Sequence, residues 1–145
     1  MSDFGAWILL LGRVLIGLNF IAVAGFAHLS KGPMFVGMAR QMSFPFPFLA
    51  SWAAGTWLVA AGASIVLGVW ADLGALMIAG FVIVAGAWFH RFWAVDDENQ
   101  KQLQTLLFWR NVTFLGAALA LFAFFAAFGH ELPLTITDPL FDLRK

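Results

Sequence analysis

The chain has 145 residues, of which 62% are hydrophobic and only 11% are charged, whereas soluble domains carry about 25% charged residues. A small water-soluble core cannot bury that much apolar surface, so we expect lipid to cover the excess. Eight Lys and Arg residues balance eight Asp and Glu residues, which argues against nucleic-acid binding. Cysteine and tyrosine are absent, which excludes disulfides, thiolate metal sites, iron–sulfur clusters and a phenolic proton donor.

Four apolar segments are predicted as helices: residues 7–28, 51–70, 73–89 and 106–128. Each approaches or exceeds the roughly 17–25 residues that cross a bilayer as a helix, and an open strand would leave its backbone groups unpaired in lipid. The first segment is not read as a signal peptide, because Asp3 stands where such a peptide carries Lys or Arg and the apolar run is too long. We therefore predict an all-α integral membrane protein, a four-helix antiparallel bundle forming a single domain over residues 1–145.

The connections between these helices differ in length and polarity. Residues 69–72 predict a tight antiparallel hairpin, with Asp72 as the cap of the third helix. The connection 29–50 contains an amphipathic stretch, which predicts a short helix at the membrane interface or dipping partly inward; a plain interfacial loop is the alternative. Residues 91–105 predict a solvated loop and helical entry, and residues 129–145 a surface tail.

Small residues recur four positions apart in the later helices, a spacing that lets helix backbones approach closely in lipid. We expect three such pairs to pack the helices together: Ala60 with Ser64, Ala75 with Ala79, and Gly116 with Ala120. The alternative is that Ala and Gly are simply frequent in this chain.

Basic residues near the helix ends indicate the orientation. One side carries Lys31, Arg40, Arg91, Lys101 and Arg110, and the other carries Arg144 and Lys145, with Arg13 inside the first helix. The positive-inside rule then places the two long connections in the cytoplasm and both termini outside, although the difference in charge is small.

Three polar residues are expected within the membrane domain. Arg13 costs at least about 2.5 kcal/mol in hydrocarbon unless it is paired, hydrated or snorkels, and Asp72 is a candidate counter-ion because it lies on the same membrane side. Snorkelling to water is the alternative for Arg13. Asn19, near the middle of the first helix, is expected to hydrogen-bond between helices as a structural residue.

A candidate binding site gathers where the first and third helices end and the fourth begins: His28, His90, Arg91, Trp93, Trp109, Arg110 and Asn111. Imidazole, guanidinium and indole groups could donate to the carbonyls of a quinone head and stack on its ring. An anionic lipid head group would suit the same residues. The structural alternative is an aromatic and basic belt that only sets membrane depth.

Metal-based alternatives use the histidines. His28 and His90 could serve as axial haem ligands, or bind a metal with Asp96 or Asp97. We disfavour both, because two histidines near helix ends do not specify iron and His130 lies on the opposite side. No metal site is predicted, and no cofactor other than a quinone.

Taken in order, several short motifs resemble the DoxX family of small bacterial membrane proteins. The opening combines Arg13 and Gly17 with Phe20-Ile21, Gly25 and Lys31, and the match continues through Pro45, Pro47, Gly55, Gly62, His90-Arg91-Phe92-Trp93, Arg110-Asn111 and Gly116. The resemblance covers nearly the whole chain before the tail and implies a four-helix fold in the bacterial inner membrane. One departure is Trp57, which occupies the zone where relatives often carry a glutamate.

The resemblance also suggests association with oxidoreductases, since a relative serves as membrane subunit of a thiosulfate:quinone oxidoreductase. It transfers no catalytic residue, and whether the chain is itself an enzyme is left open. Our leading expectation is a membrane subunit or accessory protein of a quinone-linked redox system, working with an oxidoreductase partner among membrane lipids. The alternative is a non-catalytic scaffold that packs against a larger complex or another copy of itself; a transporter is disfavoured, because four short-looped helices with one buried charge offer little substrate path.

Overall fold

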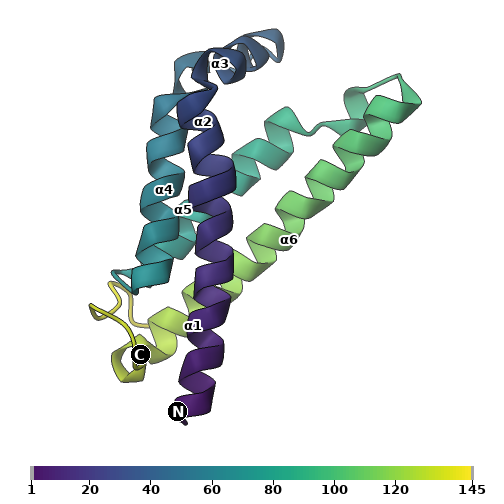
Figure 1. Cartoon of the computed structure of the whole chain (residues 1–145). Helices are drawn as coiled ribbons and strands as arrows, with labels where there is room; N and C mark the ends of the chain where they lie inside the picture. Colours follow the sequence, from purple (N-terminus) through teal and green to yellow (C-terminus); the bar gives the residue numbers. More distant parts are fainter. Residues whose placement is uncertain (1, 145) are drawn as a thin grey trace.

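The computed structural model describes residues 2–144, and this part of the chain is helical, with no β-strand (Figure 1). The elements follow in the order α1 (Asp3–Leu18), η1 (Asn19–Gly25), α2 (Phe26–Ser30), α3 (Gly32–Gln41), η2 (Pro47–Ala50), α4 (Trp52–Leu67), α5 (Ala71–Val84), η3 (Ala85–Phe89), η4 (Phe92–Ala94), α6 (Glu98–Phe128) and η5 (Gly129–Glu131). The segments η1 and η3 are π-helical, and η2, η4 and η5 are 3₁₀ turns.

Three helical stretches are long and apolar enough to cross a membrane: Asp3–Ser30, Ala71–Ala94 and Glu98–Glu131. The fourth apolar helix, α4, has 16 residues and so spans about 24 Å at about 1.5 Å per residue, less than the roughly 30 Å of a hydrocarbon core. The chain is therefore a membrane protein whose apolar helices differ in length.

The last helix begins at Glu98 rather than at residue 106, where the apolar run starts. The Asp97 side chain caps it by accepting a hydrogen bond of 2.8 Å from the Gln100 amide, which satisfies one of the free N–H groups of the first turn. The polar residues 98–105 are thus helical and extend α6 beyond its apolar part.

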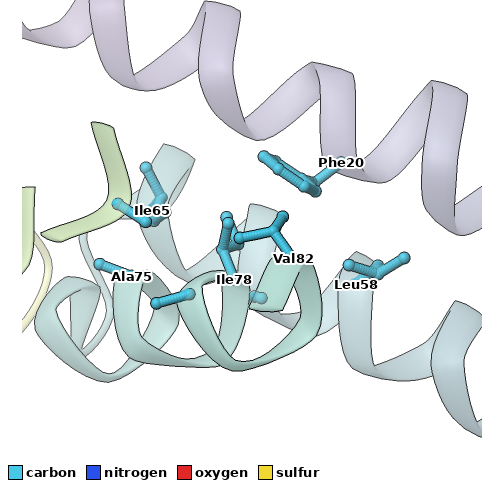
Figure 2. Packing of buried hydrophobic residues seen from close by; sticks show 9 residues of the cluster. Phe20, Leu58, Ile65, Ala75, Ile78 and Val82 are labelled. Carbon is cyan, nitrogen blue, oxygen red and sulfur yellow. The ribbon is translucent and has the colours of Figure 1, made fainter. Parts of the chain in front are cut away.

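Helix α1 packs against α4, α4 against α5, and α5 against α6. In Figure 1 the first half of α6 diverges from α2 and α3, whereas its last turns return to the end where α4 and α5 meet. Side chains from all four long helices form one core, which includes Phe20, Leu58, Ile78, Val82 and Ala118 (Figure 2). The Phe20 and Phe114 rings meet edge to face at 5.2 Å and join the first helix to α6.

Two pairs of facing glycines bring the first helix and α4 into backbone contact. A Cβ atom on Gly17 would lie too close to the Gly62 carbonyl and the Val66 side chain, and one on Gly62 too close to the Gly17 carbonyl. Gly25 and Gly55 face each other in the same way further along. Because packing replaces the hydrophobic drive in lipid, this contact defines how the two antiparallel helices meet.

The three small-residue pairs predicted from the sequence contribute unequally to helix packing. Ala75 and Ala79 are buried in the core, and Ser64 contacts Gly74 across the α4–α5 interface. Ala60, Gly116 and Ala120 are exposed, so the last pair packs against nothing within the described residues. The facing glycine pairs lie on α1, η1 and α4.

Arg13 is only 1% exposed, and its guanidinium is satisfied by backbone carbonyls. Nε donates to the Ile65 oxygen at 2.9 Å, Nη2 to the Val66 oxygen at 2.9 Å and Nη1 to the Leu134 oxygen at 2.7 Å. Ile65 and Val66 belong to the last turn of α4, where carbonyls lack helical partners and a cation is favoured. The side chain therefore joins α1, the end of α4 and the C-terminal tail, and it does not snorkel to water.

The tail folds back over the α4–α5 turn as an irregular strap, residues 132–144. The Gly68 carbonyl accepts from the amides of Ile136 and Thr137, both at 3.1 Å. Gly68 has a φ of 67°, and a Cβ there would collide with Arg13 and Thr135, so only glycine fits. The Trp70 amide also donates to Thr137 Oγ1 at 2.8 Å. Close backbone contacts thus hold a segment without regular structure.

The expected roles of Asp72 require correction. Its carboxylate is fully buried and accepts from the Phe141 amide at 2.7 Å through Oδ2; it makes no side-chain cap for α5 and no ion pair with Arg13 among the described residues. Sequence alone could not show this, because the strap reaches Asp72 from far along the chain. Asp72 therefore holds the distal part of the strap.

We predict that Gly62→Val destabilises the protein by about 1–3 kcal/mol, the usual cost of overpacking, because the new side chain would enter the backbone contact with Gly17. Thermal unfolding in detergent measures the effect. Gly80→Val is the matched control, since a Cβ on Gly80 meets no atom within 4 Å. Equal loss of stability in both variants would contradict the proposed contact.

We also predict that Arg13→Met releases the strap, because the Leu134 carbonyl loses its donor and the tie to α4 is broken. Limited proteolysis with an enzyme that cleaves after large apolar residues should then cut residues 132–144 at least about tenfold faster. Arg40→Met, which removes an exposed guanidinium on α3, should leave the cleavage rate unchanged. A strap that stays equally resistant in Arg13→Met would contradict this role.

Candidate functional site

His28 lies at the end of the first membrane-spanning stretch, in α2, where it packs on aromatic rings. Its ring stacks on Phe35 of α3 with centroids 4.0 Å apart and meets the edge of Phe81 on α5 at 5.8 Å. Nδ1 lies 2.6 Å from the Ala50 carbonyl; because a carbonyl only accepts, Nδ1 carries the proton and Nε2 remains an acceptor when the ring is neutral.

His90 follows the π-helical segment η3 at the end of the third membrane helix. Its Nδ1 lies 2.9 Å from Gln104 Oε1 in the second turn of α6, so this pair links the two helices where they leave the membrane. The neighbouring Arg91 holds its Cζ 6.0 Å from the centre of the Trp88 ring. π-helical turns are frequent at functional sites, and here one turns His90 toward α6 and Arg91 toward Trp88.

The two histidine clusters contact a common element, α3 and the turn after it. Phe35 of α3 stacks on His28, and the Met42 carbonyl at the end of α3 accepts a hydrogen bond of 3.1 Å from Trp88 Nε1. Phe44 then packs on Trp88 and Phe89 at 5.5 and 5.3 Å. The structure therefore places His28 and His90 at the same end of the molecule but in separate contact sets that α3 bridges.

The other expected site residues lie along α6 and η4. Trp93 and Trp109 each pack on Phe108, at 5.6 and 5.8 Å, and are 57% and 58% exposed. Arg110 is exposed and acts electrostatically on His90. Asn111 points the other way: it is 6% exposed, and its Nδ2 donates to the Leu107 carbonyl of its own helix at 2.9 Å. Asn111 is thus occupied within the protein.

Asn19 departs from the expected buried structural role. It is partly exposed, and its side chain makes no hydrogen bond with any residue in the range 2–144. By contrast with Arg13 and Asp72, the amide therefore holds no part of the fold together.

Trp57 also has a defined partner. Its Nε1 donates to the Met77 carbonyl of α5 at 2.9 Å. With Trp52, Thr56 and Met77 it lines a shallow groove on the outside of α4 and α5 that contains no charged side chain. The Trp57 indole therefore links α4 to α5.

We call the end of the molecule that carries His28 and His90 the histidine end. It combines ring nitrogens, a guanidinium and flat aromatic surfaces. Such groups can orient a polar ring by hydrogen bonding and stacking, but they include no nucleophile beside a base. Residues 2–144 also contain no group of three or more His, Asp or Glu residues placed to hold a metal ion.

Sequence reasoning missed Gln104, Trp88 and Phe35, which complete the two clusters. Gln104 lies in the segment predicted as a solvated loop and helical entry, and its position in the sequence gives no sign that it would contact His90. Trp88 precedes His90 by two residues, so an aromatic next to the expected site was a usable signal. Phe35 could be found only once the position of α3 was known.

The family model for DoxX matches residues 8–91, more than half of the chain. This range includes Arg13 and its two acceptors on α4, both glycine pairs, α3 and His90. Comparison with curated proteins and with solved structures gives no match. On the strength of the family match, the chain belongs to the DoxX family.

Proposed function

We propose that the chain is a membrane subunit or accessory protein of a quinone-linked oxidoreductase system in the bacterial inner membrane, with a quinone or lipid head group bound at the histidine end. The observation that carries the proposal is the His90–Gln104 pair. It holds an imidazole between two membrane helices at the point where they leave the lipid, beside Arg91, Trp88 and Arg110.

Head-group binding suits this place for reasons of depth and chemistry. With Nδ1 bonded to Gln104, His90 has Nε2 left for a ligand, and the guanidiniums of Arg91 and Arg110 can donate to carbonyl or phosphate oxygens. A long apolar tail would remain in lipid beside α5 and α6. His28, already stacked between Phe35 and Phe81, would form the second side of the site.

The same proposal requires α4 to complete a fourth crossing in an antiparallel bundle. Helix α4 is too short by itself, but the connection before it supplies three exposed apolar side chains: Phe46, Phe48 and Leu49. Aromatic groups are favoured at head-group depth, so α3 and η2 would sit in the interface and a slightly thinner bilayer would accommodate α4.

We predict that His90→Ala lowers the amount of co-purified quinone about tenfold, because loss of one ligand hydrogen bond of about 1.4 kcal/mol changes affinity by that factor. The protein is purified in mild detergent, its lipids are extracted, and quinone is quantified per chain. Gln104→Leu should have a smaller effect in the same direction, since it removes the partner that orients His90.

The control is His130→Ala at the opposite end, where Nδ1 of His130 lies 3.2 Å from Asp138. It should retain quinone like the unchanged protein. Equal quinone content in all variants would remove the proposed site, and loss of an anionic phospholipid instead of quinone would assign the site to a lipid head group.

A further inference from the structure

The outward face of the first helix carries a continuous stripe of five residues. Ile8, Gly12, Leu15, Asn19 and Val23 follow one another at intervals of four, three, four and four. Intervals of three and four residues keep side chains on one face of a helix, and the last interval is four because η1 is π-helical. We call these residues the α1 seam.

The α1 seam is uncovered in the single chain. Ile8, Leu15 and Val23 are 55%, 63% and 65% exposed. A Cβ on Gly12 would meet no atom within 4 Å, so the backbone is open to close approach there. The buried residues of the same helix, among them Arg13, Gly17 and Phe20, lie on its other side. In Figure 1 no element of the chain lies in front of α1.

Asn19 indicates that more than lipid covers this face. It lies near the middle of the 28-residue stretch Asp3–Ser30, at a depth where hydrocarbon offers no hydrogen-bond partner. Its carboxamide makes no hydrogen bond within residues 2–144, whereas Asn111 of α6 bonds to the Leu107 carbonyl. An amide left unsatisfied in an apolar medium costs a few kcal/mol, and a partner from outside the chain would remove this cost.

We propose that the partner is a second copy of this chain, packed along the α1 seam with the two Asn19 side chains hydrogen-bonded to each other. Two copies inserted with the same topology are related by a two-fold axis along the membrane normal. Their first helices then run parallel, and each seam residue meets its own counterpart at the same depth.

The chemistry of the seam is self-complementary under this symmetry. A carboxamide has both donor and acceptor groups, so two of them satisfy each other without any charge. A single Asn in a seam between two helices also fixes register and oligomeric state. Gly12 leaves room for the helices to approach, and Ile8, Leu15 and Val23 supply apolar contact. A dimer of this kind places both histidine ends on the same side of the membrane.

The absence of cysteine makes a direct test possible, since any introduced cysteine is the only one in the chain. Leu15→Cys and Val23→Cys are treated with a membrane-permeant oxidant in intact membranes, and covalent dimer is measured on a denaturing gel. The control is Gly116→Cys, which lies in the membrane part of α6 on an exposed face with open space around it. The seam positions should cross-link at least about tenfold more than the control, because equal positions face each other across the two-fold axis.

The amide is tested separately with the full chain in mild detergent, where native mass measurement should give twice the 15.9 kDa of one chain. Asn19→Leu should weaken dimerisation about tenfold, and Asn19→Gln should largely preserve it. Circular dichroism should be unchanged, since Asn19 holds nothing within its own chain. A monomeric wild-type protein, cross-linking that is as strong at Gly116→Cys as at the seam, or an Asn19→Leu variant that dimerises like the wild type would each overturn the proposal.

Discussion

A guanidinium inside a lipid-embedded protein must find its hydrogen-bond acceptors within the protein, and this requirement on Arg13 organises one end of the molecule. No carboxylate in residues 2–144 lies within ion-pair distance of it. Three carbonyls take that place, two from the last turn of α4 and one from the strap. Those acceptors are available because a helix leaves its last carbonyls free, so the end of α4, α1 and the strap must converge on one side chain.

This convergence makes the two ends of the molecule different. The Arg13 end is closed by the strap, which Gly68 and Asp72 hold through hydrogen bonds to its amides. The glycine pairs then keep the first helix against α4 up to Gly25 and Gly55. At the histidine end α6 diverges (Figure 1), and polar and aromatic side chains of α2, α3, η3 and α6 are left at the surface. The Arg13 end is thus closed by backbone contacts, whereas the proposed head-group site lies at the opposite end.

The sequence predicted the apolar helices because length and composition suffice for that in lipid. The start of α6 was placed too late, since the Gln-rich first turns lack an apolar run, although Asp97 followed by Gln100 was a readable capping signal. The strap could not be predicted, because its contacts join backbone groups far apart in the chain and leave no residue pattern. His28 and His90 were expected at one membrane interface and lie at one end; their division into two clusters depends on α3, whose position no periodicity fixes. Asn19 was assigned inward because a mid-membrane amide needs a partner, and the structure gives it none within the chain.

The central claim is that carbonyl and carboxylate contacts around Arg13 and Asp72 hold an irregular strap as firmly as a helix. Hydrogen exchange measured by mass spectrometry in detergent or nanodiscs tests it most directly. Peptides covering residues 136–143 contain the amides of Ile136, Thr137, Phe141 and Leu143, all of which donate to acceptors elsewhere in the chain. The account predicts that these amides exchange as slowly as those at the helix ends beneath them; complete exchange within seconds, while α4 and α5 remain protected, would contradict it.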